Sequence, residues 1–304
     1  MAESLVESLG RELLEAPRLV REQVEATEPI LEGEECVLAV GSGDSFAAAL
    51  AAEAASARVV AADPLEAAVG GRAAAMARRG CVLLALSVGG RTRSVVEAAR
   101  VFRGAGGRVV AVTASRGSPL AAAADEVVEM VYGGLAGGIG AARHLVMLAA
   151  VARLLGLEAW LPGGVAGGDG CFWLRSEMHS GCLSGYSAAL FNALKIYEVY
   201  GGSVRYERLE QLVHAPVYSV GSVAIYSSPG PCRAAAREVY EVLRGTGFRV
   251  ELVEASAGEG IGAAMEHAYR GLSCLYELAA RDGVVEPAYR RHRGLGELTR
   301  LIYG

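Results

Sequence analysis

The sequence has 304 residues, is 52% hydrophobic and has a formal net charge of −5 at pH 7. This apolar content exceeds the needs of one ordinary core, so we expect two domains. Charges of both signs are interspersed, and no basic block alternates with aromatic residues, which argues against a nucleic-acid partner. No uninterrupted apolar run reaches membrane-spanning length. The charged N-terminal segment does not resemble a signal peptide, so we expect a soluble cytoplasmic protein without a membrane partner.

The six cysteines are scattered, and no two of them form a CxxC pair. This spacing argues against a zinc site, and no other metal or cofactor is predicted. Most of the cysteines fit the role of small core residues. Lys195 is the only lysine and Asn192 the only asparagine. A sequence this poor in amides is typical of a thermophile, where intracellular disulfides also occur.

The first half of the chain predicts a helix followed by alternating strands and helices. An amphipathic helix is expected from about Ser4 to Glu28, with an interruption at Pro17, and a long helix from about Gly140 to Leu155. The runs between them are apolar throughout, which is typical of parallel strands buried on both faces. These predicted strands are Cys36–Val40, Ala57–Ala62, Cys81–Val88, Arg108–Ala114 and Glu126–Val131.

A glycine-rich segment, Leu161–Gly170, has no apolar period and is interpreted as a link between domains. The strand and helix pattern then resumes. Its predicted elements are strands at Cys171–Ser176, Ser222–Ser228 and Phe248–Ser256, and helices at about Tyr186–Tyr200, Ala234–Arg244 and Gly262–Arg281. We therefore predict an α/β fold with two doubly wound, flavodoxin-like parallel-sheet lobes, over residues 1–160 and 161–304.

Two strand-to-helix turns in the first lobe combine glycine with hydroxyl residues. They are "VGSGDSF" (Val40–Phe46) and "SVGGRT" (Ser87–Thr92). Ligands of such sheets lie beyond the carboxyl ends of the strands, where free amides and the helix dipole attract anions. No lysine follows the glycines, so the loops do not fit a nucleoside triphosphate site. The alternative is that Ser87 and Thr92 only cap a helix.

The segment "LSVGGRTRSVVEAA" resembles the S-x-S-G-x-T phosphate loop of the sugar isomerase (SIS) superfamily, and "GSGDSFAAA" resembles that superfamily's other Gly-Ser loop. Two positions depart from the pattern, because Gly89 replaces the second serine and Asp44 stands where Thr or Ser is frequent. The resemblance implies that a sugar phosphate is bound by residues of both loops, namely Gly43, Ser45, Ser87, Gly89, Gly90 and Thr92.

The segment "ALFNALKIYEVYGGSVRYERLEQLVHAPVYSV" (Ala189–Val220) resembles the isomerase half of glucosamine-6-phosphate synthase. Its A-L-K-x-x-E core lies at Ala193–Glu198, and the family histidine falls on His214. The resemblance implies that Glu198 is the enediol base and His214 the ring-opening acid and base. Lys195 either contacts the ligand or holds Glu198. In these families the histidine can come from the neighbouring subunit, which implies a homodimer.

The residues support this chemistry independently. Isomerisation of an aldose to a ketose moves a proton between adjacent carbons, and one partly desolvated carboxylate can make both transfers. Glu198 lies in the apolar segment "KIYEVY", as such a base would. Ring opening needs a group that titrates near neutral pH, which is the range of histidine. The alternatives are an exposed Lys195–Glu198 pair at i, i+3 and a purely structural His214.

Two further segments resemble the archaeal phosphoglucose/phosphomannose isomerases. "GGIGAARHL" matches a stretch that implies substrate contact by Arg143. The tail "VVEPAYRRHRGLGELTRLI" matches their last helix, but the family's catalytic lysine falls at about Thr299, leaving Arg300 or His292 nearby. Three functions therefore stay open: an isomerase of hexose 6-phosphates, a glucosamine-6-phosphate deaminase or isomerase, and a non-catalytic protein that binds sugar phosphates.

Overall fold

The computed structural model describes residues 3–131, 139–161, 170–291 and 296–303, and the chain folds into two compact units. We call them lobe 1 and lobe 2. Lobe 1 consists of Arg18–Leu135, Ala142–Ala159 and His292–Gly304. Lobe 2 consists of Met1–Pro17, Ala136–Ala141 and Trp160–Arg291. The sequence predicts a single division at residue 160. By the contact-based division, residues 1–17 instead belong to lobe 2, and His292–Gly304 belong to lobe 1.

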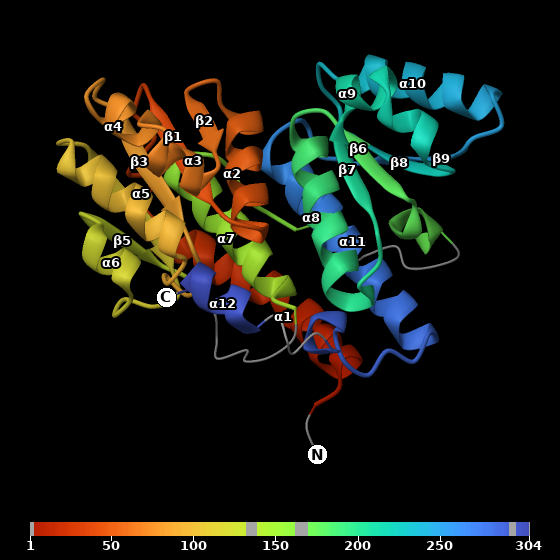
Figure 1. Cartoon of the computed structure of the whole chain (residues 1–304), viewed down its shortest axis with the longest axis horizontal. Helices are drawn as coiled ribbons and strands as arrows, with labels where there is room; N and C mark the ends of the chain where they lie inside the picture. Colours follow the sequence, from red (N-terminus) through yellow and green to blue (C-terminus); the bar gives the residue numbers. More distant parts are fainter. Residues whose placement is uncertain (1–2, 132–138, 162–169, 292–295, 304) are drawn as a thin grey trace. The chain divides into compact units, whose positions relative to one another are not determined.

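Lobe 1 is built on a five-stranded sheet with the order β2-β1-β3-β4-β5, in which every neighbouring pair is parallel (Figure 1). In register, Val37 of β1 lies beside Val59 of β2 and Val82 of β3. This strand order is that of flavodoxin-like proteins. The strands are β1 (Val37–Gly41), β2 (Val59–Ala62), β3 (Val82–Leu86), β4 (Arg108–Thr113) and β5 (Glu126–Glu129).

Both faces of this sheet are covered, as the continuous apolar strands predict. Leu38, Leu83 and Val109 pack with residues of α3 to α6 in one core cluster, while the alternate residues of the same strands are equally buried. On that other face α2 packs on β1 and β2. The helices of lobe 1 are α2 (Asp44–Ala55), α3 (Pro64–Val69), α4 (Arg72–Ala77), α5 (Arg93–Gly104), α6 (Pro119–Ala123), α7 (Ala141–Leu154) and α12 (Gly296–Tyr303).

Lobe 2 repeats the architecture with a four-stranded parallel sheet of order β7-β6-β8-β9. Its strands are β6 (Met178–Gly181), β7 (Arg205–Arg208), β8 (Ser222–Ser227) and β9 (Arg249–Glu254). Its helices are η1 (Cys171–Arg175), α8 (Ser184–Tyr200), α9 (Leu209–His214), η2 (Pro216–Ser219), α10 (Arg233–Gly245), α11 (Ile261–Arg281) and η3 (Ala288–Arg291). The predicted fold class, two doubly wound parallel-sheet lobes, is confirmed.

One predicted element of lobe 2 is wrong. Cys171–Ser176 was expected as a strand, but Cys171–Arg175 forms the 3₁₀ helix η1. Cys171 and Leu174 are buried three residues apart whereas Phe172 is exposed, which is the period of a 3₁₀ turn rather than the alternation of a strand. The sequence does not predict strands β6 and β7, because their sequences, "MHSG" and "RYER", are short and polar.

Helix α1 (Leu5–Ala26) runs through Pro17 without ending there. Its start is fixed by a capping box, in which Ser4 Oγ accepts from Glu7 N while the Glu7 carboxylate accepts from Ser4 N. A proline has no N–H to offer the carbonyl four residues earlier. Here that carbonyl, Leu13 O, accepts from the Tyr269 hydroxyl at 3.5 Å. The freed acceptor therefore has a tertiary partner, and the helix continues.

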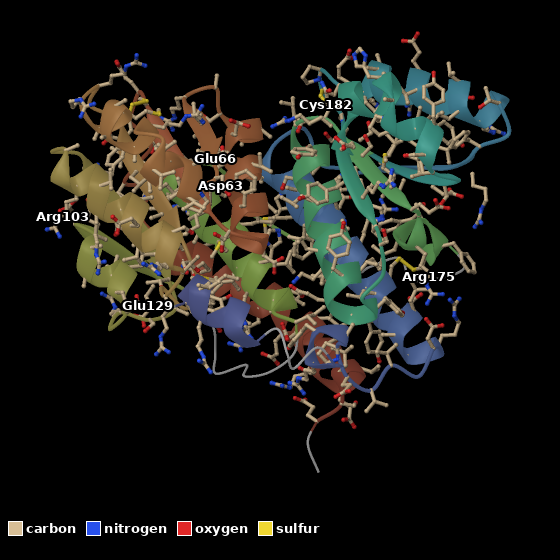
Figure 2. The ribbon with its side chains drawn as sticks, in the orientation of Figure 1. Asp63, Glu66, Arg103, Glu129, Arg175 and Cys182 are labelled. Atoms are coloured by element: carbon tan, nitrogen blue, oxygen red, sulfur yellow. A yellow bond between two sulfur atoms is a disulfide. The ribbon has the colours of Figure 1, made fainter. Side chains whose placement is uncertain are left out.

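The six cysteines form three disulfides, each within one lobe: Cys36–Cys81, Cys171–Cys274 and Cys182–Cys232. Cys36 and Cys81 directly precede the neighbouring strands β1 and β3, with Cα atoms 4.6 Å apart. Cys182, labelled in Figure 2, follows β6. In the chain-entropy model, closing loops of 45 to 103 residues stabilises a fold by about 4 kcal/mol per bridge.

Within the part of the chain that the structure describes, none of the helices has the length and apolar character of a membrane span.

The face of the second sheet beneath α8 and α11 holds a buried polar cluster. The Tyr226 hydroxyl lies 3.0 Å from His179 Nδ1, and His179 Nε2 lies 3.2 Å from Leu174 O. His267 packs edge-on against the Tyr226 ring, with Nε2 3.1 Å from Ser227 O. Both histidines are fully buried, and this burial lowers the pKa of each to about 4. The arrangement therefore suits neutral imidazoles.

We predict that these two histidines make lobe 2 sensitive to acid. Their pKa is lower in the folded protein than the ordinary value of 6.5, so the unfolded chain binds more protons below that pH. The stabilisation is complete above pH 6.5 and is lost as the pH falls to about 4, by roughly 3 kcal/mol per histidine. Denaturant titrations at stepped pH values measure it.

The matched variants are His267→Gln and His214→Gln, since His214 is an exposed histidine of the same lobe. We expect His267→Gln to flatten the pH profile of unfolding free energy by about half, and to flatten it more than His214→Gln does. Equal slopes for the native protein and His267→Gln would contradict the assignment.

Candidate phosphate-binding loops and acid–base pair

The first glycine loop of lobe 1 is a tight turn from β1 into α2. Gly43 precedes the helix with φ 58° and ψ −125°, a conformation that favours glycine. A Cβ on Gly41 would lie 2.6 Å from the backbone of Ser45, so the last strand residue must also be glycine. Ser45 is buried in the first turn of α2. The turn therefore brings the first amides of α2 directly beyond the end of the strand.

The second loop lies beside the first, because β3 pairs with β1 and Gly41 is in register with Leu86. Gly90 turns the chain with φ +61°, and Gly90 N donates to Ser87 O at 3.0 Å. The loop is fixed from both sides: Ala114 N donates to Val88 O, and Leu120 N donates to Gly90 O. A rigid loop at the carboxyl edge of the sheet follows.

Ser87 and Thr92 are both buried, and their side-chain oxygens lie 3.1 Å apart. Thr92 precedes α5 but its side chain makes no capping hydrogen bond to that helix. This observation argues against the alternative in which the two hydroxyl residues only cap the helix. The start of α5 therefore offers backbone amides next to two converging hydroxyls, which is a suitable donor set for a phosphate.

The two departures from the family pattern have different settings. Gly89 is exposed, and a Cβ placed on it would meet no atom within 4 Å, so nothing in the fold requires glycine there. Asp44 is the first residue of α2, where the positive end of the helix dipole stabilises a carboxylate.

In lobe 2, Lys195 and Glu198 form an ion pair on α8. Lys195 Nζ donates to Glu198 Oε2 at 2.7 Å and to Ile139 O at 2.9 Å. The side chain of Lys195 is 1% exposed and that of Glu198 is 34% exposed. The pair is therefore not the exposed surface pair of the alternative interpretation. The buried ammonium fixes one carboxylate oxygen of Glu198 in a partly desolvated setting, as proton transfer by a carboxylate requires.

His214 lies at the end of α9, on the same lobe as Glu198. Its side chain is 67% exposed, and Nε2 lies 3.1 Å from Glu210 Oε1 on the same helix. The observed partner of His214 is thus Glu210, not Glu198. Arg143 is partly buried in the first turn of α7 in lobe 1. His292 lies outside the described residues, and the side chain of Thr299 is not described either.

One polar group at the end of the second sheet was not singled out from the sequence. Ser184, Ser228 and Glu259 meet beyond β6 and β8, where Ser184 N donates to Glu259 Oε1 and Ser228 Oγ donates to Oε2. A signal was present, because "SGCLSG" (Ser180–Gly185) repeats the small-residue spacing of "VGSGDS" (Val40–Ser45). Glu259 itself carries no local pattern.

The described residues also line a groove of about 680 Å³ between the end of α1 and β5. Its charged lining residues are Glu28, Arg116, Glu126 and Glu129, of which Arg116 and Glu129 pair with each other. None of the predicted site residues lines this groove, so we do not assign it to the candidate site.

These features define a doubly wound α/β protein with two glycine loops at the carboxyl edge of its first sheet. Residues 31–152 match the family model of the SIS domain. The matched segment includes both glycine loops of lobe 1, and the match confirms the resemblance to the SIS superfamily for this part of the chain.

Solved structures resemble the chain along most of its length, at low identity. A glucosamine-6-phosphate deaminase from Thermotoga maritima has a TM-score of 0.63 at 13% identity, with 91% of this chain and 96% of that one covered. The C-terminal domain of glucosamine-fructose-6-phosphate aminotransferase from Francisella tularensis gives 0.67 at 14%, covering 92% and 98%. Tagatose-6-phosphate ketose/aldose isomerase from Escherichia coli gives 0.64 at 13%, covering 92% and 95%. These likenesses show the fold. No curated protein matches the sequence.

We predict opposite results at two adjacent glycines. Gly89→Ser is expected to fold like the native protein and to bind inorganic phosphate about 3- to 10-fold more tightly, because the open position gains a hydroxyl beside the cradle. Gly90→Ala is expected to destabilise the protein by about 2–4 kcal/mol, since φ is positive and the new Cβ overlaps the Ser118 hydroxyl.

Thermal unfolding measures the stabilities, and calorimetric titration with phosphate measures the affinities. Gly89→Ala serves as the control without a hydroxyl. If Gly89→Ser gained no affinity over Gly89→Ala, the loop would not act as a phosphate cradle.

Proposed function

We propose that the protein is an aldose–ketose isomerase of a sugar phosphate, with fructose 6-phosphate and glucose 6- or mannose 6-phosphate as the leading substrate class. The observation that carries the proposal is the buried Lys195 that holds the carboxylate of Glu198. A carboxylate fixed in this way is suited to take a proton from one carbon of an enediol and return it to the next.

In this proposal the phosphate is bound by the loops of lobe 1. Gly43 and Ser45 contribute the start of α2, and Ser87 and Thr92 contribute converging hydroxyls next to the amides of α5. All of these donors are neutral, so the anion is held by the backbone and the helix dipoles rather than by a counter-charge. Gly89 and Gly90 are proposed to let the second loop approach the ligand, and Arg143 is proposed to contact the substrate away from the phosphate.

Glu198 is proposed to remove the proton from C2 of the open-chain aldose, which leaves a cis-enediolate. The proton of the C2 hydroxyl passes to the C1 oxygen, and Glu198 returns its proton to C1 to give the ketose. Lys195 donates to Glu198 Oε2 and keeps the carboxylate in place for the transfer. His214 is proposed to open the sugar ring, since its imidazole is exposed and can donate or accept a proton. We further propose a homodimer, in the cytoplasm, as the working form.

A second candidate is a glucosamine-6-phosphate deaminase, favoured by the likeness of the fold to that of the Thermotoga maritima deaminase. It would use Glu198 in the same way and would release ammonia. A third candidate is binding without turnover, favoured by Gly89 in the phosphate loop and by the lack of any lysine other than Lys195.

We predict that Glu198→Gln lowers the rate of isomerisation by at least about 10³-fold and leaves substrate affinity within several-fold, because the amide keeps its shape but cannot accept the proton. The assay incubates a panel of hexose and amino-hexose 6-phosphates in ²H₂O. It follows deuterium incorporation at C1 and C2 by NMR, with ammonia release recorded in parallel. Native turnover by Glu198→Gln would contradict the role of base.

Two controls separate binding from chemistry. Thr92→Val is expected to raise the dissociation constant about 10-fold with a smaller effect on the bound reaction, since it removes a phosphate donor. Glu238→Gln changes an exposed glutamate of α10 and should alter neither quantity. Binding of a panel member without exchange or ammonia release by the native protein would favour the third candidate.

A further inference from the structure

The two lobes use the same strand-to-helix turn. β6 occupies the same place in its sheet as β1 does, and each strand runs into a long helix, α8 or α2. The residue before α8, Leu183, has φ 53° and ψ −118°, nearly the values of Gly43 before α2. Gly181 ends its strand as Gly41 does, since a Cβ on either would clash with the backbone four residues later. Lobe 2 therefore has a second cradle of the same design.

Leu183 makes this second turn unusual. Among the described residues it is the only one other than glycine with a positive φ. Side chains are rarely found in this conformation, and it persists only where the surroundings hold it. The Cys182–Cys232 disulfide next to it ties the turn to the start of α10. The loop is therefore held in the shape of an anion cradle although its sequence does not favour that shape.

A carboxylate of the chain itself lies in the second cradle. Glu259 Oε1 accepts from Ser184 N at 2.9 Å, the first amide of α8, and from Gly260 N at 3.2 Å. Glu259 Oε2 accepts from Ser228 Oγ at 2.8 Å. The donors are of the kinds that lobe 1 offers: amides at a helix start, and a hydroxyl after the next strand of the sheet. Ser184 and Ser228 are both buried.

The loop after β8 also holds Glu259 in place. Glu259 N donates to Pro229 O at 3.0 Å, and a Cβ on Gly230 would lie 2.8 Å from the Cβ of Glu259. The loop after β8 thus packs closely on Glu259 and holds its carboxylate in the cradle. Because it is part of the chain, it occupies the donors without the loss of translational freedom that a free anion incurs on binding.

We propose that Glu259 is an internal anion that fills the cradle of lobe 2 and thereby restricts phosphate binding to lobe 1. Glu259 is thus a residue that determines specificity: it leaves one phosphate site per chain although the fold builds two cradles. The part that concerns lobe 1 rests on the proposed function, whereas the occupation of lobe 2 by Glu259 does not.

The test is Glu259→Ala, titrated with inorganic phosphate by calorimetry and compared with the native protein. We expect the variant to bind one more phosphate per chain than the native protein does. Its melting temperature should fall by several degrees in chloride and recover in phosphate or formate at equal ionic strength, because either anion replaces the lost carboxylate. Glu238→Ala, an exposed glutamate with the same change of charge, should gain neither effect.

The outcomes separate the two proposals. One phosphate for the native chain and two for the variant supports both. None for the native chain and one for the variant supports the role of Glu259 and overturns the cradle of lobe 1. Equal stoichiometry in both proteins overturns the role of Glu259. If Glu259→Ala does not fold in chloride, the yield on refolding decides: a higher yield in phosphate or formate supports the proposal, and an unchanged yield overturns it.

Discussion

The close packing of a helix start against the end of its strand is the constraint on which both lobes depend. At Gly41 and at Gly181 no side chain fits between the last strand residue and the first helical turn. This packing places the starts of α2 and α8 at the carboxyl edge of the sheet, where the helix dipole favours an anion. In lobe 2 the anion is Glu259, and in lobe 1 we propose that it is the phosphate of a substrate.

The proposed chemistry depends on where the single lysine of the chain lies. Lys195 is buried among apolar neighbours on α8, and its ammonium is satisfied by one carbonyl and one carboxylate. Removing the Glu198 carboxylate would take away a charge partner of this buried ammonium, which is costly in a protein interior. The same bond that satisfies the lysine gives Glu198 a defined orientation, so stability and the proposed proton transfer rest on one contact.

Lobe 2 can bury polar residues in its sheet because these residues form hydrogen bonds with one another. His179 in β6 and Tyr226 in β8 are hydrogen-bonded across the face that α8 and α11 cover. A buried polar pair of this kind is stable only while both members keep the right protonation state, which ties the stability of the lobe to pH. None of the described strands of lobe 1, β1 to β5, contains a histidine.

The sequence by itself determined the fold class, since unbroken apolar runs such as "CVLLAL" specify strands buried on both faces. It also located the loops around Gly43 and Gly90 and the Lys195–Glu198 spacing, because glycine turns and helical periods are local patterns. Only the tertiary structure decided the conformation of three segments. "CFWLRS" is a 3₁₀ helix tied to α11 by the disulfide of Cys171, and "MHSG" is a strand whose His179 bonds to Tyr226. Pro17 stays within a helix, where the Leu13 carbonyl accepts from Tyr269. Glu259 is the plainest case, since its carboxylate accepts from the Ser184 amide 75 residues away along the chain, a separation that no local pattern can specify.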